Sequence, residues 1–351
     1  MLAGGLVMLA ICLGGLSGNV AVFAVYCREK RSRKKHLYRL NLAVMSGLGS
    51  ATYSVVAYHF LFNDELTTFG CYADGSIIGF LAVGTILQLT VISAERAWLV
   101  LRPFAARKIT ARTRWEFVVL VYCAAGALTG PPWLGWGAYS TNGDTGAYCW
   151  RVFDYRDRSL QNRLYITYLF FFSYLLPCFI IVLSYGTIFY RLRTKSVSKR
   201  SARQSQSNDR STENTPREPS SETTALQEKR RSRVQQRQVA KLSLLVVSAF
   251  LLSWTPYAAL TIWVQFVDDS MHKSIWILIT VLLAKAFVVW NPILYGLKDP
   301  DFRLAVLQLV TSVTTRGRSA GERSGESDRQ MRARRPVEAF GSVRLLEDVM
   351  L

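Results

Sequence analysis

The sequence predicts an all-α membrane protein: a bundle of seven transmembrane helices followed by a short amphipathic eighth helix. Half of the 351 residues are hydrophobic and only 19% are charged, whereas a soluble protein has about 25% charged residues. The charges gather in blocks, and the apolar runs between them have roughly 20 residues, enough to cross the hydrocarbon core of a bilayer as helices. The blocks also alternate between basic and acidic or mixed along the chain.

Seven apolar runs meet this criterion. The first has no basic residue before it and a strongly basic block after it, so we expect a span with its N-terminus outside rather than a cleaved signal peptide. In chain order, the predicted spans lie at about 4–27, 38–61, 71–100, 115–138, 164–190, 239–267 and 273–296.

The connections between the spans predict the orientation of the chain. Those after the first, third and fifth runs are basic, and residues 191–238 carry 13 Lys/Arg against five Asp/Glu. Those after the second, fourth and sixth runs are acidic or mixed. Because short Lys/Arg-rich loops stay in the cytoplasm, we expect a multi-pass plasma-membrane protein with an extracellular N-terminus and a cytoplasmic C-terminus. Contact with lipid head groups then accounts for most of the net charge of +19, and no nucleic-acid partner is expected.

The predicted domain organisation is one seven-helix domain, 1–311, followed by a cytoplasmic tail. A third cytoplasmic loop at about 195–228 and the tail, 312–351, are polar with few apolar side chains, so both are predicted to be disordered. Between the last span and the tail lies "KDPDFRLAVLQLV", in which Asp299 suits a helix N-cap. This segment predicts the short helix at the inner membrane surface.

Two of the six cysteines, Cys71 and Cys149, fall on the predicted outer side, where disulfides persist. We expect a Cys71–Cys149 disulfide that ties the second outer loop to the third span. A reduced pair is the alternative.

Five of the predicted spans carry short motifs that are weak singly but informative together. They are Gly18–Asn19 in the first span, Glu95–Arg96 at the inner end of the third, Pro177 and Tyr185 in the fifth, Trp254 with Pro256 in the sixth, and Asn291–Pro292 with Tyr295 in the seventh. In this order the chain resembles the rhodopsin-like family of G-protein-coupled receptors over about residues 10–310.

The resemblance implies an activation switch. In the family, the arginine that corresponds to Arg96 is tied to the adjacent acid, here Glu95, at rest. On activation the sixth span swings out, a G protein enters, and the residues matching Tyr185 and Tyr295 rearrange; Asn291 and Pro292 belong to the same motif. Three positions depart from the family pattern: Ala97 for Tyr, Ser46 for Asp, and Tyr122 for Trp.

Lys285 lies near the centre of the seventh span, in "LLAKAFVVWNPILY". An intramembrane cation costs about 2.5–3.5 kcal/mol on insertion scales, and the span ends are too far for the side chain to reach. Three roles are compatible with this position: a structural partner for an acid, a proton or ion relay, or a covalent site whose desolvated amine attacks an aldehyde.

The third role matches one branch of the family. The spacing of Lys285, Asn291–Pro292 and Tyr295 resembles that of an animal opsin of the non-visual, neuropsin-like type, in which this lysine carries retinal as a Schiff base. The expected counterion is Asp74, three residues after Cys71, with Asp144 in the second outer loop as the alternative. The residues expected to form the retinal pocket are Trp254, Tyr257, Tyr174 and Phe170.

The resemblance therefore predicts a photoreceptor that activates a heterotrimeric G protein and is not an enzyme. A receptor kinase and arrestin are possible further partners, and the lipid bilayer is the surrounding medium. The alternative is a retinal photoisomerase of opsin type with weak or no signalling, and a receptor for a diffusible ligand is a third reading. Soluble-enzyme motifs are absent from the sequence, and its three histidines are too scattered for a metal site.

Overall fold

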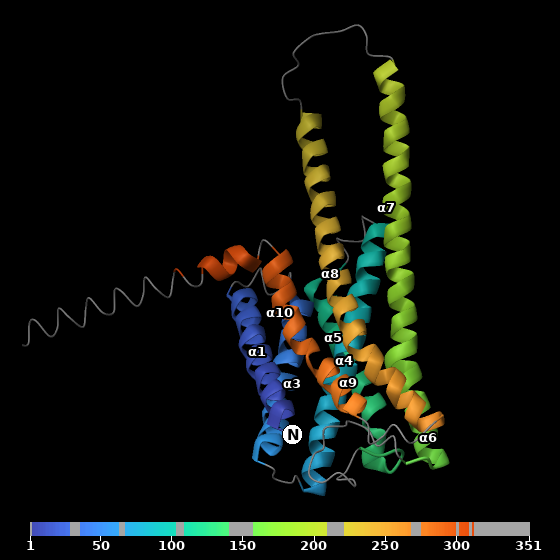
Figure 1. Ribbon diagram of the computed structural model, residues 1–351. Helices are drawn as coiled ribbons and strands as arrows, with labels where there is room; N and C mark the ends of the chain where they lie inside the picture. Colours follow the sequence, from blue (N-terminus) through green and yellow to red (C-terminus); the bar gives the residue numbers. More distant parts are fainter. Residues whose placement is uncertain are drawn as a thin grey trace, which may run out of the picture. The chain divides into compact units, whose positions relative to one another are not determined.

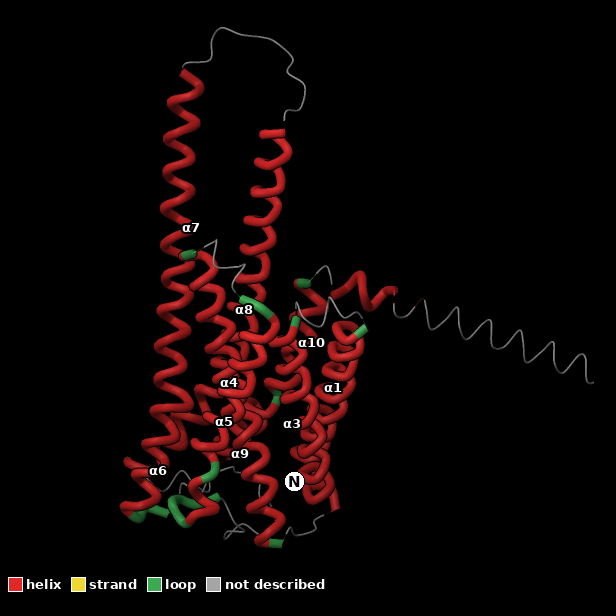
Figure 2. Tube along the Cα trace, turned by 180° about the vertical axis from the view of Figure 1, so that it is seen from behind, coloured by secondary structure: helices red, strands yellow, loops and turns green. Residues whose placement is uncertain are grey.

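The computed structural model describes residues 2–28, 36–62, 67–102, 109–139, 157–208, 221–267, 275–299, 302–308 and 311. The helices of the first 300 residues are drawn in Figures 1 and 2. They are α1 (Leu2–Cys27), α3 (Leu37–Phe62), α4 (Thr68–Leu101), α5 (Ala111–Thr129), α6 (Leu160–Phe170), α7 (Leu176–Asn208), α8 (Ser221–Phe266), α9 (Ile275–Lys285) and α10 (Phe287–Lys298), with a 3-10 turn, η2 (Pro131–Leu134), and a π-helical turn, η3 (Phe171–Leu175).

These elements correspond to the seven predicted spans. The fifth span is α6, η3 and α7 in succession, and the seventh is α9 and α10 with a bend of 40° between them. Five of the described helical stretches, and the bent pair as a sixth, are long and apolar enough to cross a membrane. Helix α5, the fourth span, is shorter and carries Arg112, Arg114 and Glu116 in its first turns.

The fourth span ends earlier than the predicted boundary at residue 138. Helix α5 stops at Thr129, and Pro131 and Pro132 begin η2. A proline has no backbone N–H to donate and restricts the residue before it. The pair therefore terminates the α-helix, although the sequence beyond it remains apolar.

Close packing of α1 against α10 fixes the seventh span in the bundle. Asn19 Nδ2 donates to the carbonyl oxygen of Val288 on α10 at 2.9 Å and to that of Gly15 at 2.7 Å. A Cβ placed on Gly18 would lie 2.5 Å from the Pro292 ring. The Gly18–Asn19 motif thus allows the two helices to approach closely and then joins them by a hydrogen bond.

The structure differs from the sequence prediction in the third cytoplasmic loop. Helix α7 continues to Asn208 and α8 begins at Ser221, so helices cover most of the segment 195–228 that was expected to be disordered; residues 209–220 lie outside the described part. In Figure 1, α7 and α8 extend past the neighbouring helices. Arg, Lys, Gln and Glu are good helix formers, and an existing helix can be extended without a new nucleation step.

The chain divides into two compact units, Met1–Pro300 and Asp301–Leu351. In the second unit residues 302–308 are helical, in agreement with the predicted short helix. Asp299, which was expected to cap that helix, is instead the C-cap residue of α10, and its backbone N–H donates to the carbonyl of Tyr295. The predicted disordered tail, 312–351, lies outside the described residues.

Candidate functional site

Lys285 is the last residue of α9 and lies beside the break in the seventh span. At Ala286 the backbone turns (φ −62°, ψ −15°), and the Val289 N–H donates to the Ala286 carbonyl three residues back at 3.1 Å. This tighter hydrogen bond separates α9 from α10. The Lys285 side chain is only 3% exposed, so the predicted intramembrane amine lies inside the protein and not at its lipid-facing surface.

The ammonium nitrogen of Lys285 lies 4.4 Å from the centroid of the Tyr53 ring on α3. Within the described part of the chain this nitrogen has no hydrogen-bond partner. A cation over an aromatic face is attracted by the ring quadrupole, by about 2 kcal/mol or more when the pair is desolvated. Sequence reasoning did not select Tyr53, because no local signal shows which face of a distant helix will meet the lysine.

Asp74 lies on α4, which begins at Thr68 with Thr67 as its N-cap. Its side chain is buried, at 7% exposure, and one of its carboxylate oxygens has no hydrogen-bond partner in the segments that the structure describes. Asp74 and Lys285 are close enough to interact electrostatically. They do not form a direct ion pair within the described residues. Each of these two buried ionisable side chains therefore has a polar atom without a partner in the described part of the chain. This costs free energy unless a ligand or another group pairs with that atom.

The four aromatic residues predicted to form a pocket do line one cavity, of about 100 Å³. Phe170 is the last residue of α6 and Tyr174 lies within the π-helical turn η3, and their rings are stacked at 5.5 Å. Trp254 and Tyr257 on α8 form an edge-on pair at 6.1 Å. The remaining wall is largely aliphatic and comes from α4, α6 and α8. The cavity is thus an apolar, aromatic-walled space.

A smaller cavity of about 20 Å³ lies next to the aromatic one, and the two share the wall residues Ala82, Phe250 and Trp254. It is also lined by Tyr53 and by Ala284, the neighbour of Lys285. Lys285 itself is not among the residues that line either of these two cavities. Trp254, together with Ala82 and Phe250, therefore separates the aromatic cavity from the smaller one, which lies nearer to the buried amine.

The inner end of the third span differs from the arrangement that the family resemblance implied. Glu95 accepts from Arg114 of α5, with 2.9 Å between Glu95 Oε1 and Arg114 Nη2, and within the described chain no ion pair joins Glu95 to Arg96. Neighbouring residues on a helix do not face each other, so the guanidinium of another helix reaches Glu95 instead. Arg96 lines an inner cavity of about 40 Å³ together with Tyr295.

The other predicted switch residues lie in the interior of the bundle. Asn291 is buried and donates to Ser46 Oγ at 3.2 Å, so the serine that replaces the family aspartate still contacts the seventh span. Pro292 lies within α10, and Tyr295, one turn further, is buried. Tyr185 on α7 is partly buried and interacts electrostatically with Arg96.

The structure does not describe the side chains of three predicted residues. Cys149 and Asp144 lie outside the described residues, and Cys71 lies in the first turn of α4 with its side chain not described. The disulfide and the alternative counterion therefore stay predictions.

Comparison with known proteins adds independent observations. Residues 18–295 match the family "7 transmembrane receptor (rhodopsin family)". Human melanopsin is 29% identical over 87% of this chain and 61% of its own length. "Rhodopsin, GQ-coupled" of the scallop Mizuhopecten yessoensis is 27% identical over 87% of this chain and 59% of its own length. This chain thus spans about 60% of the length of these relatives.

The fold has a counterpart among solved structures. The crystal structure of squid rhodopsin superposes with a TM-score of 0.75 at 24% sequence identity, covering 90% of this chain and 86% of the squid chain. Together with the match over residues 18–295, this establishes the architecture. The chain belongs to the rhodopsin family of seven-transmembrane receptors.

Proposed function

We propose that this chain is a light-sensing G-protein-coupled receptor that binds retinal covalently through Lys285. The observation that carries the proposal is the buried amine itself: Lys285 is 3% exposed, and its nitrogen has no hydrogen-bond partner among the residues that the structure describes. A structural lysine at such depth would be expected to have a direct acidic partner, because an unpaired buried charge is strongly unfavourable. An amine reserved for a covalent bond does not need one in the ligand-free chain.

The surrounding residues fit retinal. Lys285 supplies the attachment point, and Asp74 supplies a buried negative charge within its electrostatic range. The aromatic cavity at Trp254 supplies an apolar wall for a conjugated hydrocarbon ligand. When bound, retinal would supply the light absorption and the change of shape. The opsin resemblance of the "LLAKAFVVWNPILY" segment favours this ligand over other aldehydes.

The protein's own contribution is burial, charge and a connection to the inner face. Burial of Lys285 excludes the water that would cleave a covalent bond to it. Trp254 lies on α8, two residues before Pro256, so a ligand that presses on this ring acts beside the point where that helix is weakest. A ligand acts only through its preference for one of two states of the bundle.

We propose a heterotrimeric G protein as the partner at the inner face, where Arg96 and Tyr295 line one cavity. The name of the scallop relative makes the Gq class the first to test. The basic connections support an extracellular N-terminus and a cytoplasmic C-terminus in the plasma membrane. Ser/Thr-bearing cytoplasmic segments make a receptor kinase and arrestin further candidate partners.

A retinal photoisomerase of opsin type is the second candidate. Two observations favour it: Ala97 and Ser46 replace family residues of the signalling machinery, and Glu95 pairs with Arg114 rather than with Arg96. Light-dependent nucleotide exchange on a purified G protein separates the two functions, because a photoisomerase would convert retinal without accelerating exchange.

The proposal is tested on the purified chain mixed with 11-cis or all-trans retinal. We expect a new absorption band in visible or near-ultraviolet light and, after treatment with borohydride, a retinyl adduct that mass spectrometry locates at Lys285. No adduct with either isomer would refute covalent retinal binding. A reversible band without an adduct would indicate a receptor for a diffusible ligand.

A further inference from the structure

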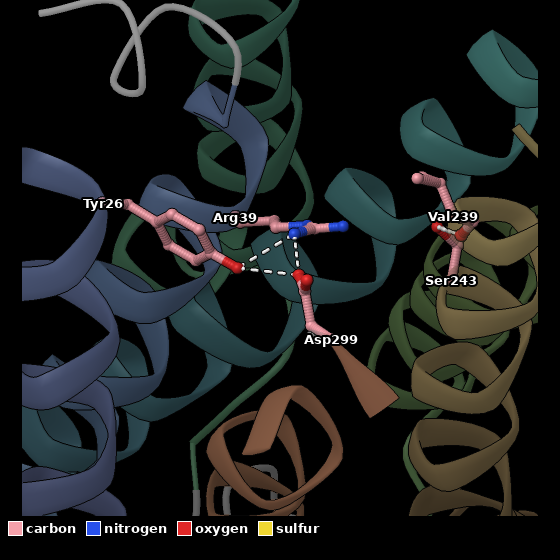
Figure 3. A network of polar contacts seen from close by, with 5 residues as sticks. All are labelled: Tyr26, Arg39, Val239, Ser243 and Asp299. Atoms are coloured by element: carbon pink, nitrogen blue, oxygen red, sulfur yellow. Dashed lines mark hydrogen bonds and ion pairs between the residues drawn. The ribbon is translucent and has the colours of Figure 1, made fainter. Parts of the chain in front are cut away.

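Three side chains form a polar cluster at the inner ends of three helices: Tyr26 in the last turn of α1, Arg39 in the first turn of α3, and Asp299 at the end of α10 (Figure 3). Arg39 Nη1 donates to Tyr26 Oη at 2.9 Å and forms an ion pair with Asp299 Oδ2. Tyr26 Oη donates to the same carboxylate oxygen at 3.1 Å. Each of the three residues therefore contacts the other two.

The cluster is mostly buried. The side chains of Arg39 and Asp299 are 15% and 8% exposed, and Tyr26 is buried. Arg39 is the only charged residue in the segment "LYRLNLAVM", so it places a cation where the surrounding pattern is apolar. A charge at such a site is tolerated only with a close partner, and that partner, Asp299, is 260 residues away in the sequence.

The same guanidinium covers the tyrosine of the predicted activation switch. Arg39 Cζ lies 5.5 Å from the centroid of the Tyr295 ring and 5.7 Å from that of Tyr26. The rings of Tyr26 and Tyr295 meet edge-on at 6.5 Å. The backbone N–H of Asp299 donates to the Tyr295 carbonyl at 2.9 Å. Tyr295 thus packs against the cluster and lines the inner cavity, which Arg39 and Arg96 also line.

We infer that Arg39 and Asp299 form an inner latch, which keeps Tyr295 and the end of α10 against α1 and α3 and so holds the receptor in its resting state. Arg39 is a positioning residue that acts through Tyr295. Movement of Tyr295 away from α1 and α3 requires its ring to leave the Arg39 guanidinium. The claim that the latch keeps the receptor at rest rests on the proposed signalling function. The claim that Arg39 and Asp299 hold the end of α10, the mechanical part, concerns the ligand-free chain alone.

The mechanical part is tested by hydrogen–deuterium exchange on the purified, ligand-free chain. In Arg39→Met and Asp299→Asn, we expect the amides of residues 293–299 to exchange faster than in the unmutated protein. Arg112→Gln is the matched control, because it breaks an ion pair with Glu116 whose side chains are 90% and 61% exposed. If residues 293–299 exchange at the unmutated rate in both latch variants, the latch does not exist.

The signalling part is tested by nucleotide exchange on a G protein in the dark and in light. Both latch variants are expected to raise the dark rate about five- to tenfold, at the low end of usual coupling between sites, while the absorption band stays unchanged. Arg39→Lys keeps the positive charge, so its dark rate is expected to stay close to that of the unmutated protein. Faster deuterium exchange with an unchanged dark rate would mean that the cluster only stabilises the structure, and this result would overturn the inference.

Two further outcomes are distinguishable. If Asp299→Asn or Arg39→Met fails to fold, the double variant Arg39→Met, Asp299→Leu removes both charges together and is measured instead, with the same expected results. If the unmutated chain gives no light-dependent exchange, the proposed function fails rather than the latch, and the deuterium exchange of the ligand-free variants still decides whether Arg39 and Asp299 hold α10.

Discussion

Helix α10 forms the inner half of the bent seventh span, and a buried charged site adjoins each of its ends. The two sites are built differently. At the inner end, Asp299 has a guanidinium and a phenol as direct partners. At the bend, Lys285 has an aromatic face at 4.4 Å and an acid without direct contact. A buried charge with direct partners holds helices together. A buried ionisable group without a direct partner is suited to react with a ligand. The predictions below test this contrast.

The largest effect is expected from Lys285→Ala. Because the amine is the proposed attachment point, the variant should lose the retinal-dependent absorption band and the borohydride adduct completely. Lys241→Ala, which changes an exposed lysine on α8, is the control and should keep both. Absorption spectra and mass spectrometry measure the outcome. Retention of the adduct in Lys285→Ala would move the attachment to another lysine.

The next effect concerns Asp74. In Asp74→Asn the absorption band should move toward the ultraviolet, since a cation at Lys285 would lose its buried acid, and Asp74→Glu should restore most of the original band. Asp157→Asn serves as the control because Asp157 is an exposed acid at the start of α6. An unchanged spectrum in Asp74→Asn would assign the counterion to Asp144 or another residue.

The two sites should also respond in opposite directions when stability is measured. Asp299→Asn leaves Arg39 uncompensated and should destabilise the ligand-free chain by about 3–5 kcal/mol. Lys285→Met removes an amine that makes no hydrogen bond to any described residue, and it should raise the melting temperature of the ligand-free chain. Thermal unfolding in detergent compares the two variants. A fall in melting temperature for Lys285→Met would show that this amine is already satisfied.

The smallest effect is expected at Tyr53. Replacing the ring in Tyr53→Leu should cost about 2 kcal/mol of cation–π attraction, whereas Tyr53→Phe keeps the ring face and should unfold at nearly the unmutated temperature. The loss of packing is separated by repeating Tyr53→Leu in the Lys285→Met background, as a double-mutant cycle. Equal costs in both backgrounds would mean that the ring does not stabilise the amine.

The sequence was sufficient for features that depend on periodicity and composition. Apolar runs predicted the seven spans, and the resemblance to opsins selected Trp254, Tyr257, Tyr174 and Phe170, which line one cavity. Such residues share a helix face, so their neighbourhood follows from positions three or four apart. Whether this cavity receives a ligand stays a prediction.

Contacts between distant segments were not predictable in this way. The Arg39–Asp299 pair spans 260 residues, and Glu95 binds Arg114 of the next helix instead of its sequence neighbour. Which guanidinium reaches which acid depends on the rotation of each helix about its axis, which periodicity leaves free within a broad apolar face. The helical ends of α7 and α8 were missed because a polar composition was taken as a sign of disorder.

The bend beside Lys285 has a mechanical consequence. The last span consists of two short rods, one of 11 residues and one of 12, joined at Ala286. Each rod keeps its own hydrogen bonds, so the angle between them can change without unwinding either one. Tilting α9 could therefore accommodate a ligand that is slightly too long or too short for its site, while α10 keeps its contacts with α1.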